Sequence, residues 1–115
     1  MKRILIVEDD VKLREELKVL DHHGYEATIQ TDMEHILASI LNGAYDLVLL
    51  DINLPHTSGV TLLKDLRKTS DVPVIMVTSQ NTEVDEVVSM SYGADDYITK
   101  PFSPKVLLAK VGALL

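Results

Sequence analysis

The sequence contains no cysteine and no tryptophan, and one phenylalanine and four tyrosines are its only aromatic residues. The lack of cysteine excludes a disulfide framework, a thiolate metal site and a cysteine nucleophile. No apolar run is long enough to span a membrane, and the Met-Lys-Arg start leads into a predicted strand rather than into a signal-peptide pattern. These absences predict a cytoplasmic protein that has no membrane partner.

The chain also lacks an excess of positive charge. It carries 18 acidic and 11 basic residues, which give a formal net charge of -7. Direct binding of nucleic acid needs a basic surface, so we expect any contact with DNA to be made by another domain. The length of 115 residues fits one domain with its own core, and 46% of the residues are hydrophobic. The sequence shows no internal repeat, low-complexity segment or linker.

Short apolar runs alternate with segments of helical spacing along the chain. The predicted strands are residues 3–7, 25–30, 46–51, 72–77 and 96–99. The predicted helices are marked by Leu13, Leu17 and Leu20; by Met33, Ile36, Leu37, Ile40 and Leu41; by Leu62, Leu63 and Leu66; by Val84, Val87 and Met90; and by Leu107, Val111 and Leu114. Asp10 is a predicted helix N-cap, Ser103 opens the last helix, and Gly24, Gly43 and Gly93 follow helix ends.

Five alternations of strand and helix predict a three-layer α/β sandwich around a parallel sheet, with right-handed crossovers. In such a sheet, ligands bind outside the carboxyl ends of the strands. Polar residues follow or end four of the predicted strands, namely Glu8 and Asp9, Asp51, Thr78, and Lys100. We therefore expect these five residues to converge on one edge of the sheet.

Glu8, Asp9 and Asp51 would place three like charges close together, which is unfavourable unless a cation neutralises them. Oxygen ligands on a partly open site suit Mg²⁺, which keeps several waters and favours a partner phosphate. The alternative is that residues 8–10 form an acidic turn followed by a helix cap. The predicted position of Lys100 on the same edge favours the metal site.

Asp51 ends an apolar run, and a carboxylate in this position can attack phosphorus and form an acyl phosphate. A cation and Lys100 would neutralise the phosphoryl oxygens. A cis bond before Pro101 could direct Lys100 across the edge, whereas the alternative is a lysine that faces solvent. Thr78 could donate its hydroxyl to the phosphoryl group and Tyr97 could swing inward, or both could be ordinary strand residues.

The four histidines show no metal-ligand spacing, and we interpret each as a surface residue. They are His22, His23, His35 and His56. His56 is the one that lies near the predicted site in the sequence.

Four segments occur together in a familiar order. They are residues 4–10, residues 46–51 with Leu54-Pro55 and Ser58-Gly59, residues 74–78, and residues 93–102. The chain, residues 1–115, resembles the receiver domain of two-component response regulators over essentially its full length. This resemblance implies a flavodoxin-like (CheY-like) fold with a five-stranded parallel sheet of order 2-1-3-4-5, flanked by five helices. It also implies a phosphoacceptor signalling domain and not an enzyme.

The resemblance implies that Asp51 accepts a phosphoryl group from the phosphohistidine of a sensor histidine kinase, or slowly from small phosphodonors. Asp9 and Asp51 would ligate Mg²⁺ directly. Glu8 would ligate it through water, and Asn53 through its backbone carbonyl.

The same resemblance assigns Lys100 to the phosphoryl group and makes Thr78 and Tyr97 a switch pair. Phosphorylation would then bias the fourth helix, fifth strand and fifth helix between two arrangements.

Residues 100–105 look most like OmpR/PhoB-type transcriptional regulators, which continue into a winged-helix DNA-binding domain. The sequence stops inside or just after a predicted helix, and we expect that domain in the full-length protein. The expected output is therefore regulation of transcription, through a domain outside this sequence.

Regulators of that type form symmetric dimers in which a basic residue of the fourth helix faces an acid of the fifth. Glu86 and Val106 occupy these positions here, and Val88 stands where a charge is common. Asp96 and Lys110 could still form an inter-subunit pair. We expect a phosphorylation-dependent homodimer whose face is weaker electrostatically, or more apolar, than in typical relatives.

Three other functions remain as alternatives. A Mg²⁺-dependent phosphohydrolase with an aspartate nucleophile typically needs a second Asp two residues on, where Asn53 cannot transfer a proton. A flavin or nucleotide binder would need a phosphate-cradling loop where the acids of residues 8–10 stand. A pseudo-receiver that is not phosphorylated usually lacks an acid, the acceptor or the lysine, and all are present here.

Overall fold

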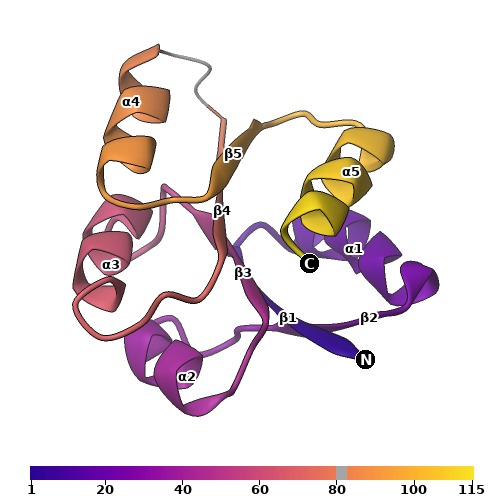
Figure 1. The fold of residues 1–115 in the computed structure, drawn as a ribbon, viewed down its shortest axis with the longest axis horizontal. Helices are drawn as coiled ribbons and strands as arrows, with labels where there is room; N and C mark the ends of the chain where they lie inside the picture. The colour runs from indigo at the N-terminus through magenta and orange to yellow at the C-terminus, as the bar shows by residue number, and fades with distance from the viewer. Residues whose placement is uncertain (80–82) are drawn as a thin grey trace.

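Apolar runs form the strands of one sheet in this computed structural model, in which the described residues are 1–79 and 83–115, with the backbone alone described for 83–85. The strands are β1 (Lys2–Val7), β2 (Tyr25–Ile29), β3 (Leu47–Asp51), β4 (Val74–Thr78) and β5 (Asp96–Thr99) (Figure 1). Every residue of β3 and β4 is buried, as expected for strands covered on both faces. β2 is only partly buried, in agreement with its position at a sheet edge.

The strands are all parallel and lie in the order β2-β1-β3-β4-β5, which confirms the predicted sheet. Val7 of β1 pairs with Leu50 of β3, and Asp51 pairs with Val77 of β4. This register brings the carboxyl ends of the strands level with one another. The residues that follow them are therefore delivered to one edge of the sheet.

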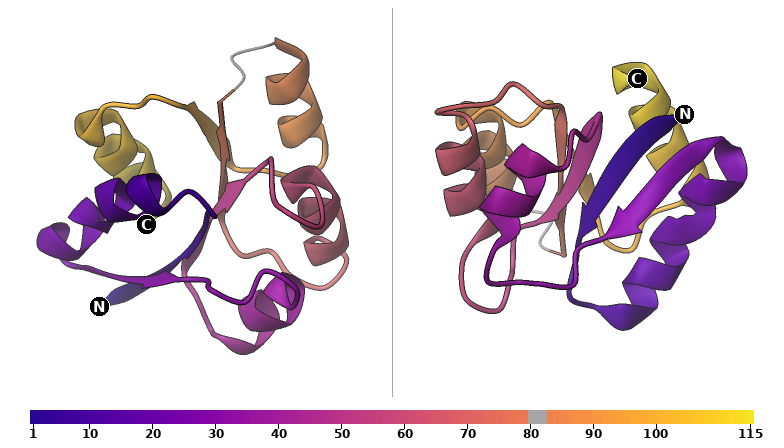
Figure 2. Two further views of the ribbon diagram at one scale, coloured as in Figure 1. Left: turned by 180° about the vertical axis from the view of Figure 1, so that it is seen from behind. Right: turned by 90° about the horizontal axis from the view of Figure 1, so that it is seen from below.

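Helices cover both faces of the sheet and complete the three predicted layers (Figures 1 and 2). One face carries α1 (Val11–Leu17), its continuation as the 3-10 helix η1 (Lys18–His23), and α5 (Pro104–Leu114). The other face carries α2 (Ile36–Asn42), α3 (Gly59–Leu66) and α4 (Glu83–Ser91). Within the described residues, no helix has the length and apolar character needed to cross a bilayer.

The core consists of two apolar clusters, one on each face of the sheet. Ile4 and Ile6 of β1 face α1 and α5, whereas Leu5 and Val7 of the same strand face α2 and α3. This alternation follows from the period of two in a strand. Each fully buried side chain of this kind stabilises the fold by about 1.5–3 kcal/mol.

The predicted helix ends are confirmed by hydrogen bonds at the N-caps. Asp10 Oδ1 accepts from the backbone N–H groups of Lys12 and Leu13 at 3.0 and 3.2 Å. Ser103 Oγ accepts from the N–H of Lys105 at 3.2 Å. The first helix differs in one respect, because it continues as η1 before Gly24 ends it at a φ of 87°.

Helix α2 begins later than its apolar pattern predicts. Asp32 Oδ1 accepts from the backbone N–H groups of Glu34 and His35 at 3.0 and 3.2 Å. This local turn competes with helical hydrogen bonding, so Met33 lies in the turn and the helix begins at Ile36.

Helix α4 is confirmed, but its apolar marker residues do not lie inside. Val87 is 55% exposed and Met90 is 44% exposed, whereas Ser89 between them is 1% exposed. The side chain of Val84 lies outside the described residues. The helix therefore presents an apolar side to solvent and a serine to the protein interior.

Candidate functional site

The predicted acids converge at the carboxyl edge of the sheet. Glu8 and Asp9 directly follow β1, and Asp51 is the last residue of β3. Their carboxylate oxygens lie within 4.8 Å of one another. Lys100 follows β5 and reaches the same place. We call these four residues the carboxylate site.

Lys100 bridges the two buried members of the carboxylate site. Its Nζ atom lies 3.0 Å from Glu8 Oε2 and 3.4 Å from Asp51 Oδ2. Glu8 and Asp51 are each 2% exposed, whereas Asp9 is exposed. The Lys100–Pro101 peptide bond is cis. The two ion-pair distances place the Lys100 side chain across the sheet edge, as predicted, rather than in solvent.

The buried acids perturb the protonation of the site. Burial raises the pKa of the Glu8 carboxyl from 4.5 to about 7, while Lys100 opposes this rise and Asp51 adds to it. Burial alone lowers the pKa of Lys100, but the Glu8 and Asp51 carboxylates together raise it above its usual value. Lys100 is thus charged at neutral pH, and the site as a whole carries excess negative charge.

Backbone groups hold the two buried carboxylates in place. The N–H of Asn53 donates to Asp51 Oδ1 at 3.1 Å, and the N–H of Asp10 donates to Glu8 Oε1 at 3.2 Å. Arg14 of α1 donates its Nε hydrogen to the carbonyl of Glu8. The loops after β1 and β3 therefore set the direction of the acids before any ligand binds.

Gly59 lets the loop after β3 close tightly over the strand end. A Cβ atom at this position would lie 2.1 Å from the carbonyl oxygen of Asp51, which no side chain permits. Instead, the N–H of Gly59 donates to the carbonyl of Ile52 at 2.7 Å. The Ser58-Gly59 pair of the sequence pattern thus has a steric reason, since Ser58 also caps α3 through Val60 N–H.

The chemistry of the site fits a divalent cation. Carboxylate oxygens are the ligands that Mg²⁺ and Ca²⁺ prefer. Among the described residues, Glu8 Oε2 is a buried oxygen without a hydrogen-bond partner, although the Lys100 ammonium lies near it. Three carboxyl groups clustered around the Lys100 ammonium favour a bound cation. The predicted alternative of a turn and cap alone does not account for them, although Asp10 does serve as a cap.

Thr78 and Tyr97 lie on neighbouring strands beside this site. Thr78 is buried at the end of β4, and its carbonyl accepts from the N–H of Lys100 at 2.7 Å. Met76 pairs with Tyr97, and Thr78 pairs with Thr99. Paired residues of parallel strands project from the same face, so the Thr78 and Tyr97 side chains lie on one face, two residues apart.

Tyr97 is half-buried and has partners on both neighbouring helices. The Glu86 carboxylate of α4 lies close enough to raise the pKa of its phenol. The Lys110 ammonium of α5 lies 5.7 Å from the centre of its ring. Lys110 is itself held by both oxygens of Asp96 at 3.0 and 3.1 Å. We call Glu86, Asp96, Tyr97 and Lys110 the Tyr97 cluster.

The sequence analysis missed two of these contacts. It placed Glu86 on a dimer face but did not link it to Tyr97, and it did not single out Arg14. No motif marks either residue. The packing of α4 beside β5, which brings Glu86 to Tyr97, depends on the three-dimensional fold and not on a spacing along the chain.

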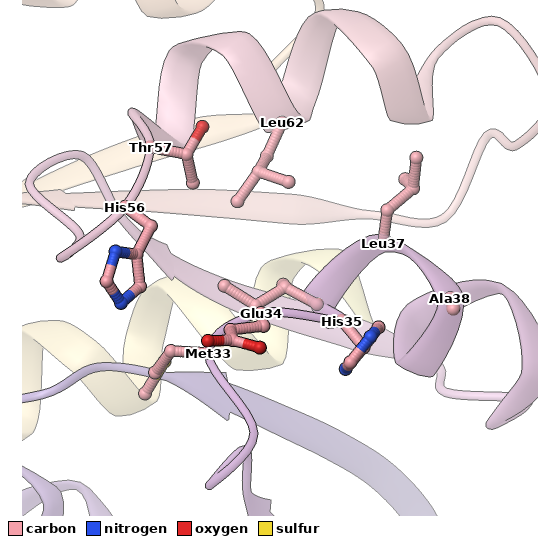
Figure 3. A pocket seen from close by; sticks show the side chains of 9 residues that line it. Met33, Glu34, His35, Leu37, Ala38, His56, Thr57 and Leu62 are labelled. Carbon is pink, nitrogen blue, oxygen red and sulfur yellow. The ribbon is translucent and has the colours of Figure 1, made fainter.

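All four histidines are exposed, as the sequence predicts. His35 pairs with Asp32 at 2.8 Å, and this raises the pKa of His35 and lowers that of Asp32. His35 and His56 both line a groove of about 650 Å³ between α2 and α3 with the loop that precedes α3 (Figure 3). This groove contains no member of the carboxylate site.

Comparison with known proteins agrees with the fold and the site. The model of the response regulator receiver domain matches residues 4–112. The chain is 47% identical, over its full length, to the sensory transduction protein RegX3 of Mycobacterium tuberculosis, of which it covers 51%. It is 40% identical over its full length to the transcriptional regulatory protein CpxR of Escherichia coli, of which it covers 50%.

A solved structure extends this agreement to three dimensions. The response regulator TrrA of Thermotoga maritima, crystallised in complex with Mg²⁺ and BeF, matches with a TM-score of 0.88 and 38% identity, and the alignment covers 100% of both chains. The chain belongs to the response regulator receiver domain family. Receiver domains are signalling modules rather than enzymes. The chain spans about half the length of the curated relatives it matches.

Proposed function

We propose that Asp51 accepts a phosphoryl group from the phosphohistidine of a sensor histidine kinase, in a Mg²⁺-dependent reaction. The observation that carries this proposal is the position of Asp51. It ends β3 beside two further acids, and the Lys100 ammonium lies 3.4 Å from its Oδ2 atom. Family membership supports the same conclusion.

In this proposal Asp9 and Asp51 would hold Mg²⁺ directly, Glu8 would hold it through water, and Asn53 would contribute its backbone carbonyl. The cation supplies positive charge that neutralises the oxygens of the incoming phosphoryl group. The clustered carboxylates of Glu8, Asp9 and Asp51 and the complex of the related TrrA with Mg²⁺ and BeF support this assignment.

The transfer exchanges one phosphorus bond for another. An Asp51 carboxylate oxygen forms a bond to phosphorus as the bond from phosphorus to the kinase imidazole breaks, and the imidazole nitrogen keeps the electron pair. Lys100 stabilises the charge on the phosphoryl oxygens and stays protonated, because its pKa is raised. The N–H of Asn53 fixes the direction of the Asp51 carboxylate.

Thr78 and Tyr97 act as the switch pair in this proposal. The Thr78 hydroxyl binds the phosphoryl group, and Tyr97 moves toward the space beside Thr78. Support comes from their common face of the sheet and their offset of two residues. The movement would change the α4–β5–α5 face, where the Lys110 ammonium now lies 5.7 Å from the centre of the ring.

The full-length protein, in this proposal, is a cytoplasmic transcriptional regulator in which a winged-helix domain binds DNA. Phosphorylation favours a homodimer through the α4–β5–α5 face. Val87, Met90 and Val106 are exposed on α4 and α5 and supply apolar area. Asp96 and Lys110 pair within one chain here, so an inter-subunit pair requires that this contact be exchanged.

Intact-mass spectrometry tests the phosphoacceptor directly. After incubation with acetyl phosphate and Mg²⁺, the wild-type chain should gain a single phosphoryl adduct, and Asp51→Asn should gain none. Asp71→Asn, which changes an exposed aspartate far from the carboxylate site in sequence, should keep the adduct. Omission of Mg²⁺ should abolish it in every variant.

A folded chain, checked by circular dichroism, that neither gains an adduct nor binds beryllofluoride would support the pseudo-receiver instead. Sedimentation tests the dimer separately. We expect weak dimers of the beryllofluoride complex with little salt dependence, because the face is apolar. Tight dimers that dissociate with salt would contradict the proposed face.

A further inference from the structure

Asp9 is the exposed acid of the carboxylate site, so its direction depends on its backbone more than on packing. Glu8 and Asp51 are each 2% exposed, and both contact the Lys100 ammonium. Asp9, in contrast, lies in an exposed position at the start of the turn between β1 and α1. Whatever fixes the backbone on either side of Asp9 therefore also fixes its carboxylate.

Two hydrogen bonds restrain the peptide groups that flank Asp9. The carbonyl of Glu8 belongs to the first of these groups and accepts from Arg14 Nε at 2.5 Å. The N–H of Asp10 belongs to the second and donates to Glu8 Oε1 at 3.2 Å. Each bond restrains the plane of a whole peptide group, because the atoms of a peptide group are coplanar. Arg14 and the Glu8 side chain thus set the backbone from which the Asp9 carboxylate projects.

The Glu8 carbonyl is bound by a side chain because β1 has already ended. The strand stops at Val7, so Glu8 lies beyond its pairing with β2 and β3. A backbone carbonyl that leaves a sheet at a partly buried position costs free energy unless another donor replaces the neighbouring strand. Arg14 supplies that donor from α1.

Arg14 stands on a rigid support. Its backbone N–H donates to the carbonyl of Asp10 at 3.0 Å, within the first turn of α1. Leu13 and Leu17 of the same helix are buried and belong to the apolar cluster that contains Ile4 of β1. The Arg14 side chain therefore connects a packed helix to the turn that carries two of the acids.

We propose that Arg14 is a positioning residue of the cation site, which fixes the direction of the Asp9 carboxylate through the Glu8 carbonyl and thereby strengthens the binding of Mg²⁺. This inference rests on the proposed function, since it names a residue that prepares the same site. A ligand that is already held in place loses less conformational freedom when the cation binds. The Nε donor of Arg14, and not its charge, provides this restraint.

Two substitutions at Arg14 separate the donor from the charge. Glutamine has its amide nitrogen at the same position along the side chain as Arg14 Nε, so Arg14→Gln keeps the donor and removes the charge. Methionine has a methyl group there, so Arg14→Met removes both. In nitrogen-15 NMR titrations with Mg²⁺ at pH 8, Arg14→Met should bind about three- to tenfold more weakly than the wild-type chain. Arg14→Gln should stay within about twofold of the wild-type affinity, because the hydrogen bond remains.

The same spectra contain a signature of the restraint itself. Before Mg²⁺ is added, the amide signals of Asp9 and Asp10 should shift in Arg14→Met and stay near their wild-type positions in Arg14→Gln. These two amides belong to the peptide groups that the hydrogen bonds restrain.

Arg67→Met is the matched control for a general loss of stability. Arg67 also donates its Nε hydrogen to a backbone carbonyl, that of Gly93 at 2.9 Å, and its Nη2 atom lies 3.0 Å from Asp95 Oδ2. Gly93 and Asp95 precede β5, so these contacts lie at the amino end of the sheet and away from the carboxylate site. Arg67→Met should lower the urea midpoint at least as much as Arg14→Met does, and it should leave the Mg²⁺ affinity unchanged.

The possible failures are distinct. Wild-type Mg²⁺ affinity in Arg14→Met would overturn the role of Arg14 alone, and so would an Arg14→Gln variant that binds as weakly as Arg14→Met. An equal loss of affinity in Arg67→Met would show that stability, and not position, controls binding. A wild-type chain whose amide signals do not respond to Mg²⁺ would overturn the metal site of the proposed function and this inference with it.

Discussion

Lys100 and Lys110 both contact carboxylates, but the surroundings of the two lysines differ. Lys100 bridges Glu8 and Asp51, which are each 2% exposed, at the carboxyl edge of the sheet. Lys110 pairs with Asp96 on the α4–β5–α5 face, where the side chains of both partners remain about one-third exposed, 30% and 32%. The two contacts have similar lengths of 3.0 Å. The two contacts differ in how far their partners are exposed to solvent.

Burial makes the charges of the carboxylate site costly, whereas the partly exposed ion pair of Asp96 and Lys110 is easy to exchange. Water does not stabilise Glu8 and Asp51, so loss of Lys100 or gain of a cation changes their energy strongly. Asp96 and Lys110 exchange their contact for water at little cost. The carboxylate site is thus suited to bind charge, and the Tyr97 cluster is suited to rearrange. The predictions below test this contrast from the largest expected effect to the smallest.

Gly59→Ala should have the largest effect, because its Cβ atom would meet the Asp51 carbonyl at 2.1 Å. The backbone of β3 and its loop must shift, which we expect to lower the free energy of unfolding by about 3 kcal/mol. Urea denaturation measures it. Gly112→Ala is the matched control, since a Cβ there meets only the Tyr25 hydroxyl at 4.0 Å and alanine favours a helix by about 1 kcal/mol. Equal effects of the two changes would contradict a closely packed site.

Lys100→Met should lower the free energy of unfolding by about 2 kcal/mol at pH 8 without metal. The change leaves Glu8 and Asp51 buried without a countercharge, and the effect is smaller than for a fully enclosed pair because Lys100 is 20% exposed. Addition of Mg²⁺ should recover much of the loss, because a cation replaces the ammonium. A variant that is destabilised equally with and without Mg²⁺ would contradict the cation site.

Mg²⁺ affinity should fall as the pH drops below about 7, by up to tenfold per pH unit, because the Glu8 proton must leave first. Without metal, the folded chain keeps this proton up to about pH 7, while the unfolded chain loses it near 4.5. The contribution of Glu8 to stability therefore falls as the pH rises from about 4.5 to about 7. Glu8→Gln should remove this pH dependence, and calorimetric titrations at several pH values check both statements. A pH-independent affinity in the wild-type chain would show that Glu8 is ionised throughout.

Lys110→Met should have the smallest effect on stability, about 0.5 kcal/mol or less, because the pair with Asp96 is partly exposed. Because both variants replace a lysine by methionine, comparing them in the same urea experiment isolates the effect of burial. A loss as large as that of Lys100→Met would show that the α4–β5–α5 face is not easily rearranged.

The sequence predicts the carboxylate site well because strand ends determine it. An apolar run that ends in Asp51, and strands that end before Glu8 and Lys100, leave little choice once the sheet is parallel. The N-caps of α1 and α5 follow equally from local hydrogen bonds. The start of α2 was predicted too early, because the Asp32 turn competes with the helix.

The Tyr97 cluster could not be predicted in the same way. The spacing of Val87 and Met90 predicts helix α4 correctly, but it implies the wrong buried side. Only the packing of α4 beside β5 shows that Ser89 lies inside and that Glu86 reaches Tyr97. β5 is a short edge strand, and α4 covers it only partly. The apolar residues of α4 are therefore not all needed in the core and can lie on the exposed surface.

The most direct test of the account is whether a phosphoryl mimic at the buried site changes the exposed face. Fluorine NMR of the fluorotyrosine-labelled chain, with Mg²⁺ and beryllofluoride, measures this. The account predicts that the Tyr97 signal shifts on binding, that the Tyr25 and Tyr45 signals at the opposite edge stay in place, and that Asp51→Asn shows no change. Beryllofluoride bound at Asp51 with an unmoved Tyr97 signal would contradict it.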